Sequence, residues 1–167
     1  MADLVGQLLP DLVLPSTSHI PVSLAHLIGL TVLFIYPWTG KPDYPNPENW
    51  DHIPGAHGST PQSLAYSEAS PEFLHLGVKC FGVSQLDKEW QQDFASRNQL
   101  AMPLLSDAAG DLGRALGLQY ITTGGKSYLK RRTLLAKNRQ IVFDRVDVAP
   151  PEGDAAFMLA YLRNFSK

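Results

Sequence analysis

The chain has 167 residues, of which 44% are hydrophobic and 18% charged, a length and composition that fit one globular domain over residues 1–167. Its formal net charge of −2, its single short basic cluster and the lack of a long apolar stretch or secretion signal argue against nucleic-acid and membrane partners and predict a cytoplasmic protein. Because Cys80 is the single cysteine, an internal disulfide and a cysteine-rich metal site are excluded.

The first strongly patterned segment is a strand predicted over residues 31–36. Its sequence, TVLFIY, is a continuous run of β-branched and aromatic residues, which is typical of strands buried on both faces of a sheet. Pro37 ends this run, and a segment rich in proline, glycine and asparagine follows from Trp38 to about Thr60. Because loops of this length in a compact domain are commonly functional, we expect this loop to form part of a functional site.

A helix is predicted to begin where this loop ends. Pro61 suits the first turn of a helix, and either Ser59 or Thr60 can serve as its N-terminal cap. The Ser70-Pro71 pair interrupts the helix, which then resumes as far as residue 76 and stops at a glycine.

The rest of the chain continues to alternate strands and helices. We predict strands over residues 78–84, 103–105, 132–136 and 140–146, and helices over residues 87–98, 107–116 and 152–165. The last helix is expected to bury Phe157, Leu159, Ala160 and Leu162. The order of these elements predicts an α/β fold with a mixed central β-sheet and helices on both faces.

Position 59 is a favourable place for a nucleophile. A residue in the first turn of a helix lies among unpaired backbone N–H groups at the positive end of the helix dipole. This environment suits anions and lowers the pKa of a thiol. The residue found there is Ser59.

The segment around Ser59 resembles the active-site segment of the peroxiredoxins, and in particular their bacterioferritin-comigratory, or Q, branch with a long loop before the site. The resemblance rests on a core strand ending in Tyr36-Pro37, on Pro54-Gly55, and on Gly58-Ser59-Thr60-Pro61. Three further stretches are similar to the family: GVKCFGVS at 77–84, MPLLSD at 102–107 and KRRTLL at 130–135. Together these stretches span nearly the whole chain, in the family's order and spacing.

The resemblance implies a thioredoxin-like fold and a thiol-dependent peroxidase that reduces hydrogen peroxide or organic hydroperoxides. In that family a cysteine thiolate attacks the peroxide and becomes a sulfenic acid, while an arginine favours the thiolate and holds the peroxide oxygens. By position, Ser59 falls where the attacking cysteine is expected and Arg131 where the arginine is expected, with Arg132 as the less favoured register. Pro37 and Gly58 fall at substrate-binding positions.

The resemblance also implies the partners of the reaction. We expect a peroxide substrate, an external thiol reductant similar to thioredoxin, glutaredoxin or glutathione, no cofactor and no metal, and a monomer or homodimer. Leu64 occupies the place where many members of this branch keep a second, resolving cysteine. Ala56 replaces the threonine whose hydroxyl usually contacts the nucleophile and the substrate.

Serine cannot perform the chemistry expected at position 59. A thiol pKa of about 8.5 can be lowered into a range of about 3.5 to 7.5, whereas an alkoxide lies far outside such tuning, and a sulfenic acid requires sulfur. We therefore expect this chain to be inactive through Ser59. The intact surroundings favour a replacement of cysteine by serine; they are Gly58, Thr60, Pro61 and Arg131. A natural loss, giving a redox-silent binding or regulatory protein, stays open.

Other interpretations of these residues have less support. A hydrolase elbow needs glycine two residues before and two after the serine, where this chain has His57 and Pro61. The loop residues Asp51, His52 and His57 are of metal-ligand types, but their irregular spacing is typical of a solvated loop.

The remaining candidates are a thiol and a set of loop aromatics. Cys80 lies in an apolar strand, which favours a small buried hydrophobe over a resolving thiol. Trp38, Tyr44 and Trp50 lie in the long loop, where they can line a substrate entrance, form a subunit interface or cover the edge of the core.

Overall fold

The centre of the molecule is a five-stranded mixed β-sheet with the strand order β5-β4-β3-β8-β9. The computed structural model describes residues 3–165. The strands of this sheet are β3 (Leu30–Ile35), β4 (Val78–Ser84), β5 (Leu104–Ser106), β8 (Arg132–Lys137) and β9 (Gln140–Arg145). Because β3 is parallel to β4 and antiparallel to β8, the parallel and antiparallel halves of the sheet meet at β3.

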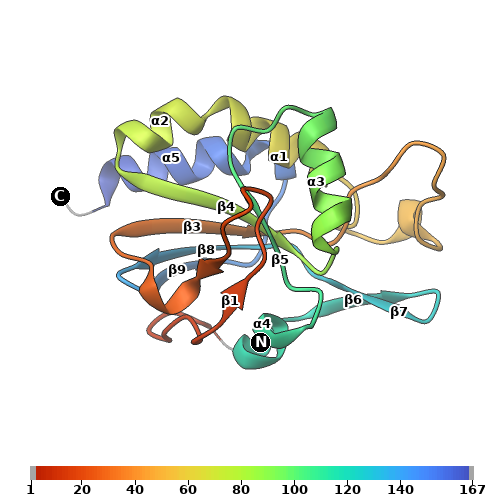
Figure 1. The fold of residues 1–167 in the computed structure, drawn as a ribbon, viewed down its shortest axis with the longest axis horizontal. Helices are drawn as coiled ribbons and strands as arrows, with labels where there is room; N and C mark the ends of the chain where they lie inside the picture. The colour runs from red at the N-terminus through yellow and green to blue at the C-terminus, as the bar shows by residue number, and fades with distance from the viewer. Residues whose placement is uncertain (1–2, 166–167) are drawn as a thin grey trace.

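Helices cover both faces of the sheet (Figure 1). One face carries α1 (Ser59–Glu68), α2 (Ser70–His75), α3 (Lys88–Arg97) and α5 (Asp154–Asn164). The other carries α4 (Asp111–Leu116) and the N-terminal pair β1 (Val13–Leu14) and β2 (Val22–Ser23). The predicted α/β fold with a mixed sheet is therefore confirmed. None of the helices within residues 3–165 has the length and apolar character needed to cross a bilayer.

The burial of β3 on both of its faces explains why its sequence is apolar throughout. Side chains alternate between the two faces of a strand, so Val32 and Phe34 join the core beneath α1 and α5, whereas Leu33 and Ile35 join the core on the α4 side. All four are fully buried. The prediction of a strand buried on both faces is confirmed.

One predicted helix boundary is confirmed and another differs from the prediction. The structure ends α1 at Glu68 and begins α2 at Ser70, as the Ser70-Pro71 pair indicates. In contrast, α4 begins at Asp111 instead of residue 107, with Gly110 as its cap. Asp107 still accepts hydrogen bonds from the N–H groups of Leu112 and Gly113, at 2.9 and 3.0 Å, so its carboxylate satisfies the first turn from outside the helix.

The predicted buried face of α5 is wrong at two positions. The stripe that packs on the sheet consists of Ala155, Met158, Leu159 and Leu162, whose spacing follows one helical face. Phe157 and Ala160 lie off this stripe, and Phe157 is 43% exposed. Its ring instead stacks on Phe143 of β9, and the guanidinium of Arg145 lies 3.8 Å from its centroid.

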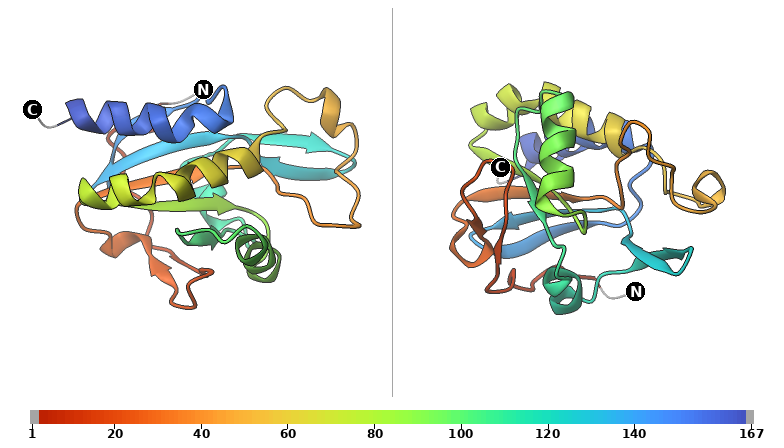
Figure 2. Two further views of the ribbon diagram at one scale, coloured as in Figure 1. Left: turned by 90° about the horizontal axis from the view of Figure 1, so that it is seen from above. Right: turned by 45° about the vertical axis from the view of Figure 1, so that its right-hand side comes forward.

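The hairpin of β6 (Tyr120–Thr123) and β7 (Lys126–Leu129) was not expected from the sequence. Its two-residue turn is Gly124-Gly125, with both residues at positive φ, a turn type that glycine favours. The hairpin projects from the same end of the molecule as the 38–58 loop (Figures 1 and 2). The two are joined by a hydrogen bond of 2.6 Å from Thr123 Oγ1 to the Glu48 carbonyl.

Short 3₁₀ helices complete the chain. They are η1 (Leu24–His26), η2 (Trp50–His52) and η3 (Pro151–Gly153). The second lies in the 38–58 loop, and Trp50 packs edge-on against Tyr128 of β7 with 5.2 Å between ring centroids. The hairpin therefore supports the long loop from one side.

Gly82 in β4 gives a direct test of core packing. A Cβ at this position would come within 2.6 Å of Leu104 and 2.8 Å of the Phe34 ring, and both neighbours are fully buried. We therefore expect Gly82→Ala to lower the free energy of unfolding by about 1–3 kcal/mol through overpacking. Urea unfolding of this variant measures the loss.

Gly40→Ala is the matched control for Gly82→Ala. Its Cβ would lie 3.7 Å from Trp38, an ordinary contact, so its free energy of unfolding should change by less than about 0.5 kcal/mol. Equal stability of the two variants would contradict the packing described for β4.

Candidate active site

The N-terminus of α1 places Ser59 at the centre of the candidate site. The predicted cap, Ser59 or Thr60, is wrong: Gly58 is the cap and lies at φ 112, in the left-handed region that glycine favours. A side chain at Gly58 would also bring its Cβ within 2.6 Å of Pro151. Ser59 is therefore the first residue of the helix, and its side chain, 3% exposed, is available for contacts other than capping.

The guanidinium of Arg131 contacts Ser59 directly. Nη1 donates hydrogen bonds to Ser59 Oγ at 3.1 Å and to Gln62 Oε1 at 2.6 Å. Nη2 donates to the backbone carbonyls of residues 55, 56 and 57, at 3.3, 3.2 and 3.1 Å. Arg131 therefore holds the end of the long loop against the start of α1.

The site is electropositive. Burial lowers the pKa of Arg131 to about 10, while the nearby charge of Asp154 acts in the opposite direction, so the guanidinium remains charged at neutral pH. The N-terminus of α1 adds a second positive contribution at the same place. A negative charge on the side chain of residue 59 would be stabilised by both.

A buried carboxylate lies behind Arg131. Asp154, at the start of α5, is fully buried and accepts hydrogen bonds or an ion pair from Gln62, Tyr66, Thr133 and Arg145. Gln62 bridges the two charged groups, because its Oε1 accepts from Arg131 and its Nε2 donates to Asp154 Oδ2 at 3.1 Å. Burial, followed by the charge of Asp154, raises the pKa of Tyr66, which therefore stays a neutral donor.

This supporting network was not predicted from the sequence. Gln62 carried a weak signal, because a residue three positions after Ser59 lies on the same side of a helix. Asp154 carried none, since an acidic residue in the first turn of a helix is an ordinary feature.

A pocket of about 260 Å³ opens beside Ser59. The lining residues are Trp38, Thr39, Gly40, Asn46, Trp50, Ala56, His57, Gly58, Ser59, Thr60 and Pro61. Trp38 and Trp50 meet edge to face with 5.9 Å between ring centroids. Tyr44 is 57% exposed and packs against Trp90, with 5.2 Å between centroids. Two of the three loop aromatics thus line the pocket beside Ser59, and Tyr44 lies outside it.

The other predicted site residues lie in different places. Arg132, the less favoured register, pairs with Asp144, its Nε donating to Oδ1 at 2.7 Å. Gly58 lines the pocket, while Pro37 is buried and is not among its lining residues; the substrate-binding roles of both stay predictions. Leu64 is 40% exposed.

The loop histidine His57 does not form a hydrolase dyad with Ser59. Its Nε2 lies 2.6 Å from Asp51 Oδ1, whereas the hydrogen-bond partner of Ser59 Oγ among residues 3–165 is Arg131. A guanidinium donates a proton in a hydrogen bond and cannot accept one, so it does not activate a serine. Within the same residues, no group of three or more His, Cys, Asp or Glu side chains is arranged to hold a metal ion.

Cys80 lies in β4, opposite Val32 of β3. It packs against the apolar core beneath α2, and burial raises the pKa of its thiol. A thiol in this state is a poor nucleophile. Its use as a resolving thiol stays untested.

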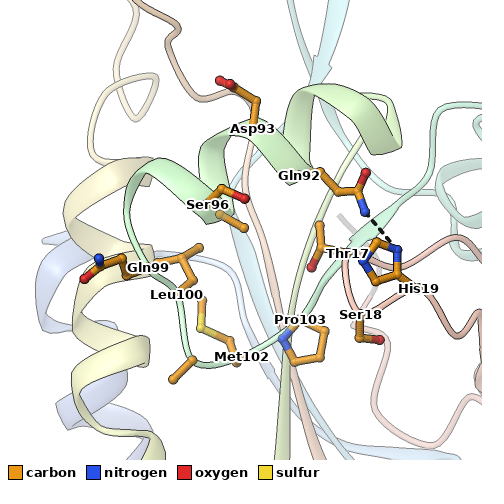
Figure 3. Close-up of a pocket in the computed structure, with 12 residues that line it drawn as sticks. Thr17, Ser18, His19, Gln92, Asp93, Ser96, Gln99, Leu100, Met102 and Pro103 are labelled. Atoms are coloured by element: carbon orange, nitrogen blue, oxygen red, sulfur yellow. Dashed lines mark hydrogen bonds between the residues drawn. The ribbon is translucent and has the colours of Figure 1, made fainter.

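A larger pocket of about 730 Å³ lies elsewhere, between α3 and residues 17–19 (Figure 3). His19 and Gln92 join across it with 3.2 Å between Nδ1 and Nε2. Neither Ser59 nor Arg131 lines this pocket. The chemistry-bearing residues therefore gather at the smaller pocket.

Known proteins resemble this chain along most of its length. The family model for Redoxin matches residues 4–159. A putative peroxiredoxin of Mycobacterium tuberculosis is 26% identical over 141 residues, which are 83% of this chain and 82% of that protein.

Solved structures match the fold along almost the whole chain. The peroxidoxin BcpB of Mycobacterium tuberculosis has a TM-score of 0.77 at 24% identity, covering 98% of both chains. The bacterioferritin comigratory protein of Xanthomonas campestris, studied for its alkyl peroxide reduction activity, has a TM-score of 0.75 at 28% identity, covering 99% of this chain and 100% of its own. The predicted thioredoxin-like fold is confirmed.

The buried carboxylate gives a stability test of the site. Asp154→Asn would leave the Arg145 guanidinium, 13% exposed, facing a neutral amide at a fully buried position. We expect this variant to lose about 3–5 kcal/mol of unfolding free energy, as when one partner of a buried ion pair is removed. Urea unfolding measures this change.

Asp111→Asn is the control, because it removes one partner of an exposed pair with Arg114. Its cost should be at most about 1 kcal/mol. If Asp154→Asn loses no more unfolding free energy than Asp111→Asn, the result would contradict the conclusion that the buried Asp154 carboxylate stabilises the fold.

Proposed function

This chain belongs to the Redoxin family, and we propose that its site is that of a peroxiredoxin-type, thiol-dependent peroxidase in which Ser59 stands at the position of the attacking cysteine. The observation that carries the proposal is the 3.1 Å hydrogen bond from Arg131 to Ser59 Oγ at the first residue of α1. A thiolate at this position would meet the guanidinium and the helix N-terminus together. Both would lower the pKa of that thiol.

The proposed reaction uses a cysteine in place of Ser59. Its thiolate attacks one peroxide oxygen, an S–O bond forms and the O–O bond breaks. The sulfur is oxidised by two electrons to a sulfenic acid, and the peroxide is reduced to water or an alcohol. Arg131 donates hydrogen bonds through Nη1, which already contacts the side chain of residue 59.

The return step is proposed to depend on an external thiol, similar to thioredoxin, glutaredoxin or glutathione. Position 64 holds leucine, and Cys80 is the single cysteine of the chain. Because burial raises the pKa of the Cys80 thiol, it is poorly suited to attack a sulfenic acid at position 59. A thiol from outside the chain would then reduce the sulfenic acid and release water.

With Ser59 in place, we propose that the chain keeps the geometry of the reduced site without its chemistry. The hydroxyl accepts the Arg131 hydrogen bond that a thiolate would accept, but it has no sulfur to oxidise. The intact contacts of Arg131 support a replacement of cysteine by serine. The alternative, a redox-silent binding or regulatory protein of the same fold, rests on Ser59 itself.

We propose Gly58 and Pro37 as residues that shape the substrate site. Gly58 lines the pocket and allows the backbone to turn into α1 at positive φ. Pro37 is buried at the end of β3 and directly precedes Trp38 and Thr39, which line the pocket. Its fixed φ would hold the chain direction there.

Restoring sulfur tests the proposal. Ser59→Cys should consume stoichiometric hydrogen peroxide or an organic hydroperoxide and gain the mass of one oxygen atom at position 59, because the site stabilises a thiolate there. Intact-mass spectrometry after trapping of the sulfenic acid, together with peroxide consumption, gives the measurement.

The unmodified chain is the control, since it carries Cys80 alone. The unmodified chain should show neither reaction, because its thiol is partly buried in β4 and this burial raises the thiol pKa. A Ser59→Cys protein that folds normally and is no more reactive than the unmodified chain would refute the assignment of position 59.

A further inference from the structure

A histidine and an aspartate form a pair at the rim of the small pocket. His57 lies two residues before Ser59, and both line the pocket of about 260 Å³. The Nε2 atom of His57 lies 2.6 Å from Asp51 Oδ1, with side chains 55% and 77% exposed. The backbone carbonyl of His57 also accepts a hydrogen bond from Arg131. His57 is thus held at two points beside the position of attack.

The peroxidase reaction requires a proton donor for the leaving oxygen. When the O–O bond of an alkyl hydroperoxide breaks, an alkoxide leaves, and a positioned acid speeds such a step. Arg131 is a poor candidate, because its Nη atoms are occupied by Ser59, Gln62 and backbone carbonyls and it stays charged at neutral pH. Thr60 lines the pocket, but a hydroxyl is too weak an acid for the purpose.

We propose that His57, oriented by Asp51, is the catalytic acid that protonates the leaving oxygen of the hydroperoxide. This inference rests on the proposed function. Of the described residues that line the pocket, His57 is the one histidine, the side chain that most often serves as a general acid in proteins. Because Nε2 pairs with Asp51, Nδ1 is the ring nitrogen without a hydrogen bond among the described residues, and we assign the proton transfer to it. An aspartate that fixes the ring orientation of a catalytic histidine is an established arrangement.

The sulfur of a thiolate at position 59 attacks the terminal oxygen of R–O–O–H, forming S–O–H as the O–O bond breaks. The departing R–O⁻ takes the proton from Nδ1 of the His57 imidazolium and leaves as an alcohol. The neutral ring keeps its Nε2–H bond to Asp51 and is protonated again from solvent, to which it is exposed.

The nature of the leaving group gives a sharp test. A peroxyacid releases a carboxylate, which is stable without a proton at neutral pH, whereas an alkyl hydroperoxide releases an alkoxide that is not. In the Ser59→Cys background, His57→Gln should therefore slow oxidation by tert-butyl hydroperoxide by about tenfold to a hundredfold, at the low end of general-acid effects because water competes. Oxidation by peroxyacetic acid should change by less than about twofold. Stopped-flow kinetics with each oxidant measures both rates.

His52→Gln in the same background is the matched control. His52 is an exposed histidine of the same loop that does not line the pocket, so neither rate should change. Equal slowing with both oxidants in His57→Gln would indicate a structural role and overturn the proposal, as would no slowing with either. If the Ser59→Cys parent reacts with neither oxidant, the proposed function itself fails, a result that is distinguishable from loss of the histidine effect alone.

Discussion

The hydrogen bonds of Arg131 hold together parts of the chain that are distant in sequence. Its guanidinium reaches the last carbonyls of the long loop at residues 55–57, the first side chain of α1 at Ser59, and Gln62 one turn further on. Arg131 itself stands just before β8, so these contacts fasten the loop and the helix to the central sheet. The conformation of the site depends on this single buried cation.

Asp154, which forms an ion pair with Arg145, also favours the charged form of Arg131, although no hydrogen bond joins Asp154 to Arg131. Gln62 lies between them, and the two ends of its amide face opposite charges. A carboxylate in direct contact would draw the Nη atoms away from Ser59 and oppose a negative charge there. The Gln62 amide accepts a hydrogen bond from Arg131 and donates one to Asp154, so it separates the carboxylate from the guanidinium. This arrangement stabilises Arg131 and preserves its positive field at position 59.

The sequence was sufficient for the parts of the fold that depend on local pattern. The strand over residues 78–84 and the interruption at residues 70–71 are found as predicted, because buried strands and helix breaks have clear local signatures. The proximity of Ser59 and Arg131 followed only from the family resemblance, since 72 positions separate them in the chain.

Long-range contacts explain what could not be predicted. Asp154 and Gln62 form a hydrogen bond although 92 positions separate them in the chain. No local sequence pattern predicts such a contact. Phe157 was assigned to the core by its hydrophobicity, but the stripe of α5 that faces the sheet is set by the whole helix, and an aromatic contact with Phe143 accommodates the ring outside it. The β6–β7 hairpin was not predicted, although the Gly124-Gly125 pair is a local signal for such a turn.

The central claim is that the structure around position 59 stabilises a negative charge on its side chain. The most direct measurement is an ultraviolet titration of the thiolate in Ser59→Cys, carried out with and without Arg131→Ala. We predict a thiol pKa within about 3.5 to 7.5 with Arg131 present, and a return toward the ordinary value of about 8.5 without it. A pKa at or above the ordinary value in Ser59→Cys, unchanged by Arg131→Ala, would contradict this claim.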